Sequence, residues 1–250
     1  MQFWNIMVIL ADFAMFRIPY TTLLTRFCAT ENPQALMRTI VFMYFWSTYV
    51  SQLFTVLFCG LRVALLFSAT QKTTKKIATF MPPIIIICGL LAALPHFSTD
   101  SFCLQLVEPF VYGSILIISK FHSNNPYVVY INMYIYLSVT ITITVLNLMM
   151  MYKVRQKKYL GFQRSVNQAS KIERTLTGTM IILLFPMIVS LCISIGEINR
   201  IGSFSYILLI RPIFIDARVH IVTCYFYFTH PIFKKGSPQS SVSHMSRATL

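Results

Sequence analysis

Long apolar runs constrain the fold of this 250-residue chain more than any other feature. The run MIILLFPMIVSLCISI, residues 180–195, contains no charged side chain. A lipid hydrocarbon core about 30 Å thick needs roughly 20 such residues per helix. A window of that length finds six candidate spans: 3–22, 39–67, 77–95, 127–152, 175–196 and 203–230. A β-barrel would show short alternating segments instead, so the sequence predicts an all-α, polytopic helical membrane protein.

Composition and charge distribution agree with a bilayer environment. Hydrophobic residues make up 56% of the chain and charged residues 11%, whereas a soluble domain carries about 25% charged residues. The net charge of +14 is concentrated in the connections 68–76 and 153–174 and in the C-terminal tail, while 96–126 carries only Lys120. The positive-inside rule places the basic segments and the N-terminus in the cytoplasm, and 23–38 and 96–126 outside. This pattern argues against nucleic-acid binding.

Two cysteines, Cys28 and Cys103, fall in the two connections assigned to the outside. Extracellular surroundings are oxidising, so we expect a Cys28–Cys103 disulfide. The alternative is a pair of unrelated thiols.

The last span contains polar side chains that hydrocarbon does not favour, namely Arg211, Asp216, Arg218 and His220. Asp216 and His220 are four residues apart and share a helix face. Asp12 of the first span is a possible partner of Arg211 or a companion to Asp216. Polar residues within a span usually face the protein interior and have functional roles. We therefore predict an intramembrane polar switch of Asp12, Asp216 and His220; the alternative is a structural pair that fixes helix register.

Aromatic and polar residues in the outer halves of the spans are candidates for a ligand pocket, which is typically concave and mostly apolar. The predicted set is Tyr44, Trp46, Tyr49, Gln52, Tyr130, Tyr134, Tyr206 and Arg211. Aromatic residues also form the interfacial belts of membrane proteins or pack between helices. Because Arg211 is the main fixed charge, we expect a small ligand that is largely apolar or weakly acidic.

Three stretches carry a family resemblance: FCGLRVALLFS (58–68), IERTLTGTMIILLFPMI (172–188) and RPIFIDARVHIVTCYFYFTHPIFKK (211–235). In these the chain resembles the nematode serpentine chemoreceptors, in the superfamily of serpentine receptor class gamma (Srg), with the sister class Sru also possible. The resemblance implies a G-protein-coupled-receptor-like bundle that detects environmental chemicals or pheromones at the plasma membrane of sensory neurons. It implies seven spans. Six are found here, so we expect the first helix to be missing.

The resemblance also implies a heterotrimeric G protein as partner. Arg62 lies at the cytoplasmic end of the second span, where rhodopsin-like receptors keep an arginine that contacts the G protein, although Leu61 replaces their acidic residue. With Lys153 and Arg155, Arg62 forms the predicted G-protein-facing set. The basic connections should also attract anionic headgroups of the lipid bilayer.

A chain with several apolar spans is also compatible with functions other than a receptor. A truncated, non-signalling receptor remnant is one alternative. A transporter is another, but the paired broken helices typical of transporters are not found. The scattered histidines form neither a metal site nor a catalytic group, so we expect no enzyme and no cofactor. We expect one bundle over 1–235 and a disordered cytoplasmic tail over 236–250.

Overall fold

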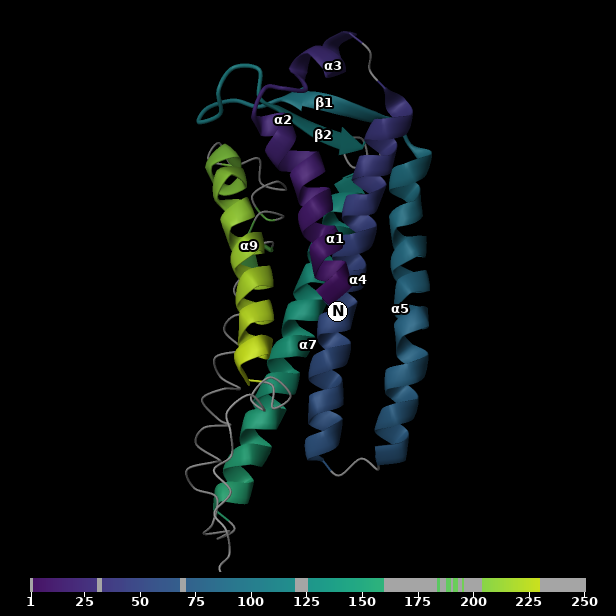
Figure 1. Cartoon of the computed structure of the whole chain (residues 1–250), viewed down its shortest axis with the longest axis vertical. Coiled ribbons are helices and arrows are strands. Elements are labelled where there is room, and N and C mark those ends of the chain that lie inside the picture. Colours follow the sequence, from purple (N-terminus) through teal and green to yellow (C-terminus); the bar gives the residue numbers. More distant parts are fainter. Residues whose placement is uncertain are drawn as a thin grey trace, which may run out of the picture.

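The computed structural model describes residues 2–30, 33–67, 71–119, 126–159 and 204–229, and the single positions 184, 188, 189, 191, 192 and 195. The elements in chain order are α1 (Gln2–Asp12), the π-helical turn η1 (Phe13–Arg17), α2 (Ile18–Tyr20), α3 (Thr25–Thr30), α4 (Gln34–Leu66), α5 (Gln71–Ser98), β1 (Ser101–Gln105), β2 (Ile115–Ser119), α7 (Pro126–Tyr159) and α9 (Phe204–Thr229) (Figure 1).

The helical membrane fold is confirmed. Within the described residues, helices long and apolar enough to cross a bilayer occur at four of the predicted spans: Gln2–Tyr20, Gln34–Ala64, Thr74–Ser98 and Asn132–Lys153. The sixth predicted span forms the helix α9, which carries Arg211 and Asp216 and is not among these four. The fifth predicted span, 175–196, lies outside the described residues except at six positions, and the tail 236–250 lies outside them altogether.

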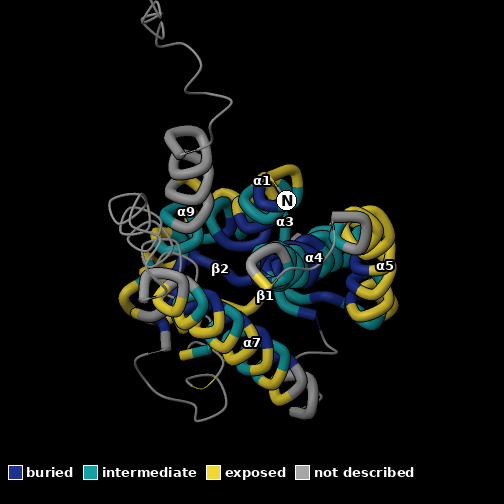
Figure 2. The backbone as a smooth tube through the Cα atoms, turned by 90° about the horizontal axis from the view of Figure 1, so that it is seen from below, coloured by how far each residue is buried: buried dark blue, intermediate teal, exposed yellow. Residues whose placement is uncertain are grey.

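Helix α4 is the centre of the bundle, because α1, α5 and α7 all pack against it (Figure 2). Val41, Tyr44 and Val50 of α4 are buried, and Phe16 of η1 packs with Tyr44 in the same cluster. An apolar helix surrounded by other helices buries residues on several faces, which explains why the apolar run of this span shows no simple one-sided pattern.

Helices α4 and α5 approach closely at Gly89, which is buried. A Cβ atom at Gly89 would lie 2.5 Å from Cγ2 of Val50, closer than side-chain atoms can approach. Small residues at helix–helix interfaces let the backbones approach in this way in membranes.

Figure 2 shows exposed residues along the outward faces of α5 and α7. The exposed residues of these helices include the apolar Ile84, Ile87 and Leu91 of α5 and Ile141 of α7. A soluble monomer rarely exposes such continuous apolar surface. In a bilayer these side chains meet lipid tails, as expected for a membrane protein.

A β-hairpin covers one end of the bundle, which we call the hairpin end (Figure 1). Strands β1 and β2 pair antiparallel, with Cys103 opposite Ile117. The two strands were not predicted, because this segment was expected to be only a connection. A disulfide joins Cys103 to Cys28, which lies on α3. The carboxamide of Gln34 also fixes β1, donating to the Ser101 carbonyl at 2.9 Å and accepting from its N–H at 3.1 Å. The hairpin is therefore attached to α3, which follows the first span, and to the first residue of α4.

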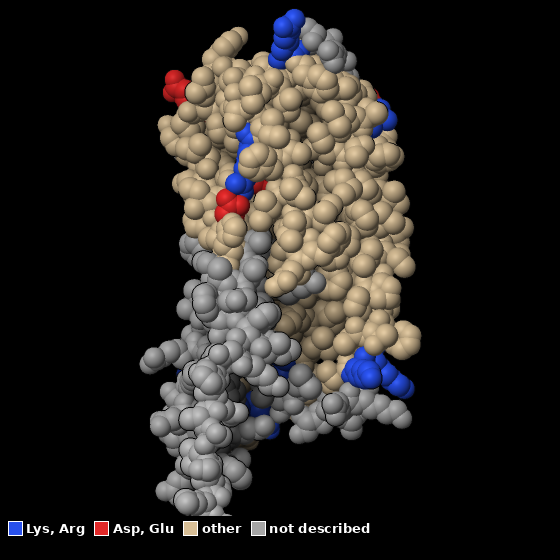
Figure 3. Space-filling model, viewed as in Figure 1, with Lys and Arg blue, Asp and Glu red and all other residues tan. Residues whose placement is uncertain are grey.

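The opposite end, which we call the basic end, holds the last residues of α4 and the first residues of α5 (Figure 1). Figure 3 shows Lys and Arg atoms gathered there. Lys75 and Lys76 of α5 are exposed at this end. The two ends thus differ in charge, as the positive-inside rule requires of a membrane protein.

Candidate functional site

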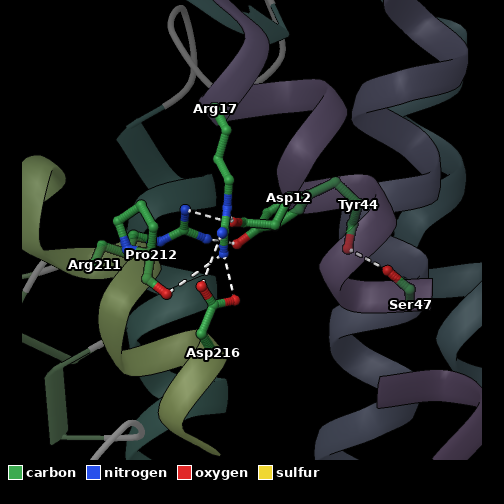
Figure 4. Close-up of polar contacts among 7 residues, drawn as sticks. All are labelled: Asp12, Arg17, Tyr44, Ser47, Arg211, Pro212 and Asp216. Atoms are coloured by element: carbon green, nitrogen blue, oxygen red, sulfur yellow. Dashed lines mark hydrogen bonds and ion pairs between the residues drawn. The ribbon is translucent and has the colours of Figure 1, made fainter. Parts of the chain in front are cut away.

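Four charged side chains from the first and last described helices meet where these two helices pack together (Figure 4). We call Asp12, Arg17, Arg211 and Asp216 the ion cluster. Asp12 accepts from both arginines: Oδ1 lies 2.9 Å from Nη1 of Arg211, and Oδ2 lies 3.2 Å from Nε of Arg17. The pairing of Asp12 with Arg211 is one of the two arrangements considered from the sequence.

Arg17 connects the two acidic residues. Its guanidinium donates to both carboxylate oxygens of Asp216, from Nη1 at 2.8 Å and from Nη2 at 2.6 Å. Such two-pronged arginine–carboxylate pairs are shorter and stronger than neutral hydrogen bonds. Nη2 also approaches the Pro212 carbonyl at 3.5 Å. Since Pro212 and Asp216 are four residues apart, both acceptors lie on the face of α9 that meets Arg17.

The π-turn η1 explains how Asp12 and Arg17 meet although they are five residues apart. In a regular α-helix, residues i and i+5 point about 140° apart. In η1 the N–H of Ile18 donates to the Phe13 carbonyl, five residues back, and this wider turn brings Arg17 towards Asp12. Pro19 gives a local reason for the turn, since its ring would clash with the Met15 carbonyl in a regular α-helix.

Burial is graded across the cluster. The side chain of Asp12 is fully buried and that of Arg211 is 9% exposed, whereas Arg17 and Asp216 are 22% and 34% exposed. Figure 3 shows acidic and basic atoms reaching the surface together in the upper half of the bundle, surrounded by uncharged residues. The side of the cluster with Asp12 and Arg211 is therefore buried in the protein, whereas the side with Arg17 and Asp216 reaches the surface of the bundle.

Mutual neutralisation makes the cluster tolerable in the membrane. One charged residue at the centre of a span costs about 2.5–3.5 kcal/mol on insertion scales, so charges left unpaired in this part of the bundle would be costly. Two arginines and two aspartates cancel formally, and each makes at least one ion pair. Removing one member of such a buried group leaves an uncompensated charge, which is strongly destabilising.

Arg211 extends the cluster to the central helix α4. Its Nη2 donates to the Tyr44 hydroxyl. Its guanidinium carbon lies 4.0 Å from the centre of the Phe16 ring and 5.3 Å from that of Tyr44, a cation–π geometry. Arg211 was predicted as a ligand-binding residue. The structure places it among protein partners from three helical elements, so its charge is already satisfied.

The predicted ligand residues of α4 point inward. Tyr44 and Tyr49 are buried, and the Tyr49 hydroxyl donates to Oδ1 of Asn132 on α7. The indole N–H of Trp46 donates to the Ile86 carbonyl of α5 at 3.3 Å. Gln52 is 2% exposed, and its Oε1 has no hydrogen-bond partner within the described residues. An unpaired buried amide oxygen is costly, and Gln52 is therefore the residue of this set that has an open hydrogen-bond acceptor.

Three other predicted ligand residues lie on the outside of the bundle. Tyr130 and Tyr134 of α7 and Tyr206 of α9 are all exposed. The structure does not bring them together with Tyr44, Tyr49 and Gln52. Aromatic residues suit both the interior and the lipid interface, so the residue types alone could not separate the two groups. Tyr136, which was not predicted, lies close enough to Tyr44, Tyr49 and Arg211 to interact electrostatically with them.

The predicted switch set is partly assembled. Asp12 and Asp216 both belong to the ion cluster and are linked through Arg17, which sequence analysis did not include. His220 is exposed, and the described contacts of Asp216 go to Arg17 and not to His220. The side chain of Arg218 lies outside the described part of the structure. The sequence feature that could have indicated Arg17 is its position, as a charged residue inside the first span, five residues after Asp12 and two before Pro19.

The predicted G-protein-facing residues lie at the basic end. The Arg62 guanidinium stacks 4.2 Å from the centre of the Phe58 ring. Nζ of Lys153 donates to Gln156 at 2.9 Å and lies 5.2 Å from the centre of the Phe67 ring, just after α4. Arg155 is exposed on α7. These contacts hold cationic groups of α4 and α7 at the same end of the bundle.

Membrane-crossing helices around a charge-paired interior define a polytopic membrane protein of receptor or transporter type. The family model of the serpentine type 7TM GPCR chemoreceptor Sru matches residues 1–236, and the chain belongs to this family. This is a family of receptors and not of enzymes. The predicted resemblance to nematode serpentine chemoreceptors is thus confirmed, and between the classes left open the match is to Sru.

A curated relative agrees with the family. The chain is 26% identical over 109 residues to the serpentine receptor class U-26 of Caenorhabditis elegans. The aligned region covers 43% of this chain and 38% of that receptor's own length.

Proposed function

We propose that the chain is a chemosensory receptor that binds a small environmental or pheromone ligand and signals through a heterotrimeric G protein. The observation that carries this proposal is the ion cluster, which ties the first and last described helices to the central helix through Arg211 and Tyr44. Membership of the Sru family supports the chemosensory role. The hairpin end is the extracellular side, in agreement with its disulfide and its low positive charge, and the membrane is the plasma membrane of a sensory neuron.

The ligand binds beside α4, in contact with Tyr44, Tyr49 and Gln52. These three residues face the interior from one helix, and Tyr44 is also a partner of Arg211. A ligand carrying an O–H or N–H group could donate to Oε1 of Gln52, which lacks a partner in the described residues. The paired state of Arg211 favours a largely apolar ligand over a permanently charged one, because a new charge would be left uncompensated.

Signalling works through a change in the ion cluster. Tyr44 is shared between the ligand and Arg211, so a ligand that draws the Tyr44 hydroxyl away weakens the hold of α4 on α9. Arg17 and Asp216 are partly exposed and can separate at lower cost than the buried pair of Asp12 and Arg211. The ligand then shifts the population between two packings of α9, according to its affinity for each. At the basic end, Arg62, Lys153 and Arg155 form the G-protein contact.

The proposal is tested in cultured cells that express the receptor with a promiscuous G protein and a calcium reporter. A panel of small alcohols, amides, carboxylic acids and quaternary amines is applied to wild type, Tyr44→Phe and Asp216→Asn, with surface expression measured in parallel. We expect activation by neutral or weakly acidic compounds, a weaker response in Tyr44→Phe and altered basal signalling in Asp216→Asn. If Asp216→Asn changed neither surface expression nor response, both the switch and the structural interpretation would fail. Activation by quaternary amines alone would contradict the proposed ligand chemistry.

A further inference from the structure

The tip of the β-hairpin, residues 106–114, presents apolar side chains away from the bundle. Val107, Val111 and Tyr112 are 69%, 73% and 94% exposed. Its backbone is held in shape by hydrogen bonds from Leu106 N–H to the Ser114 carbonyl at 2.9 Å and from Ser114 N–H to the Val111 carbonyl at 2.9 Å. The three apolar side chains are thus displayed by a closed, hydrogen-bonded turn.

Contacts with Tyr20 fix the height of the tip along the bundle. Tyr20 is the last residue of the first membrane-crossing helix. The Phe110 ring lies 4.6 Å from the Tyr20 ring, and the Ser114 hydroxyl donates to the Tyr20 carbonyl at 2.8 Å. Thr25 also donates to the Gly113 carbonyl. The tip therefore lies at the level where a spanning helix ends and lipid headgroups begin.

The chemistry of the tip fits this level. Residues 106–114 carry one charge, Glu108, together with two exposed valines and a tyrosine. Tyrosine is enriched at membrane–water interfaces because its ring is apolar and its hydroxyl is polar. Small apolar groups at the same depth bury area against the acyl chains.

We propose that the hairpin tip is a lipid-binding surface that inserts Val107, Val111 and Tyr112 into the headgroup region of the membrane leaflet at the hairpin end. The tip then anchors the hairpin to the bilayer, and the disulfide between Cys103 and Cys28 transmits this anchoring to α3. The hairpin is held from two sides, by the helix ends and by lipid.

The test places a tryptophan at the tip of the full chain. Tyr112→Trp is compared with Arg26→Trp, at an exposed position on α3, the helix drawn beyond the hairpin at this end of the bundle (Figure 1). Both variants are reconstituted in phosphatidylcholine nanodiscs with and without acyl-chain bromination, and wild-type fluorescence from Trp4 and Trp46 is subtracted. Because Tyr112 is almost fully exposed, its replacement removes little packing. Surface expression of each variant at the wild-type level would confirm that it folds.

We expect the added fluorescence of Tyr112→Trp to shift to the blue and to fall by at least half in brominated lipid, while the Arg26→Trp signal responds mainly to aqueous iodide. Quenching of both variants by iodide and of neither by bromolipid would place the tip in water and overturn the proposal. A blue-shifted signal that neither quencher reaches would show that protein covers the tip, and would overturn it as well. A Val111→Ser variant of Tyr112→Trp should lose part of the bromolipid quenching.

Discussion

Arg17 and Asp216 lie 199 positions apart in the sequence and form a two-pronged ion pair. The pair joins the first described helix to the last, and Asp12 couples it to Arg211. The closure of the bundle therefore depends on four charges that have different degrees of burial.

Neutralising the two aspartates should have unequal effects. Asp12→Asn removes the fully buried negative charge shared by both arginines and leaves Arg211 without its carboxylate, a change that costs about 3–5 kcal/mol for a buried pair. Asp216 is one-third exposed, so Asp216→Asn should cost clearly less. Both losses are measured as the midpoint of thermal unfolding in detergent and as the amount of each variant at the cell surface. Equal losses would contradict the graded burial.

A compensating change provides the control for the first comparison. Asp12→Asn combined with Arg211→Gln removes one positive and one negative charge, so the cluster stays neutral overall. This double variant should unfold at a higher temperature than Asp12→Asn alone. If it were the less stable of the two, the cost of Asp12→Asn would not come from an uncompensated charge.

Loss of the disulfide should destabilise the hairpin end. Cys28 and Cys103 close a loop with a sequence separation of 75, and removing a native disulfide typically costs about 2–5 kcal/mol. Cys28→Ser, Cys103→Ser and the double variant should therefore lower the unfolding midpoint by similar amounts. Cys88→Ser, at an exposed free cysteine, is the matched control. A disulfide-linked peptide in a non-reduced digest tests the bond directly, and its absence would refute the pairing.

Adding one methyl group at Gly89 should separate α4 from α5. Its Cβ would lie 2.5 Å from Val50 Cγ2, and the β-branched side chain of Val50 cannot easily rotate away in a helix. Overpacking of this kind costs about 1–3 kcal/mol, measured as a loss in thermal stability. Gly60→Ala meets nothing within 4 Å and should be neutral or slightly stabilising. If Val50→Ala restored the thermal stability of the Gly89→Ala variant, the clash between the two side chains would be identified as the cause of the loss.

Gln52 should show opposite effects on stability and on response. Because Oε1 is buried without a partner among the described residues, Gln52→Met removes an unsatisfied acceptor, whose burial costs about 1–3 kcal/mol. We expect a higher unfolding midpoint together with a weaker response to ligands that donate hydrogen bonds. A stability loss in Gln52→Met would indicate that the carboxamide has a structural partner instead.

Much of the fold could be predicted because spans depend on hydropathy alone, which a window detects. The pairing of Asp12 with Arg211 could also be predicted as one of two arrangements, since a buried charge needs an opposite charge beside it. Arg17 was missed because helical spacing turns it away from Asp12 unless a π-turn intervenes. The outward position of Tyr134 could not be predicted either, because an aromatic residue is equally suited to a lipid-facing surface. The strands at 101–105 and 115–119 depend on contacts with distant segments such as Gln34.

The π-turn η1 makes the first helix sensitive to its length in residues. Asn5, before the turn, accepts from the Ser51 hydroxyl at 2.7 Å, and Arg17, at its end, meets Asp216. Deleting one residue from 13–16 would restore a regular helix, and it would also rotate the two halves relative to each other by about 100°. Only one half could then keep its contacts. A single-codon deletion at this point, with no charge removed, should therefore break either the Asn5–Ser51 contact with α4 or the Arg17–Asp216 pair with α9.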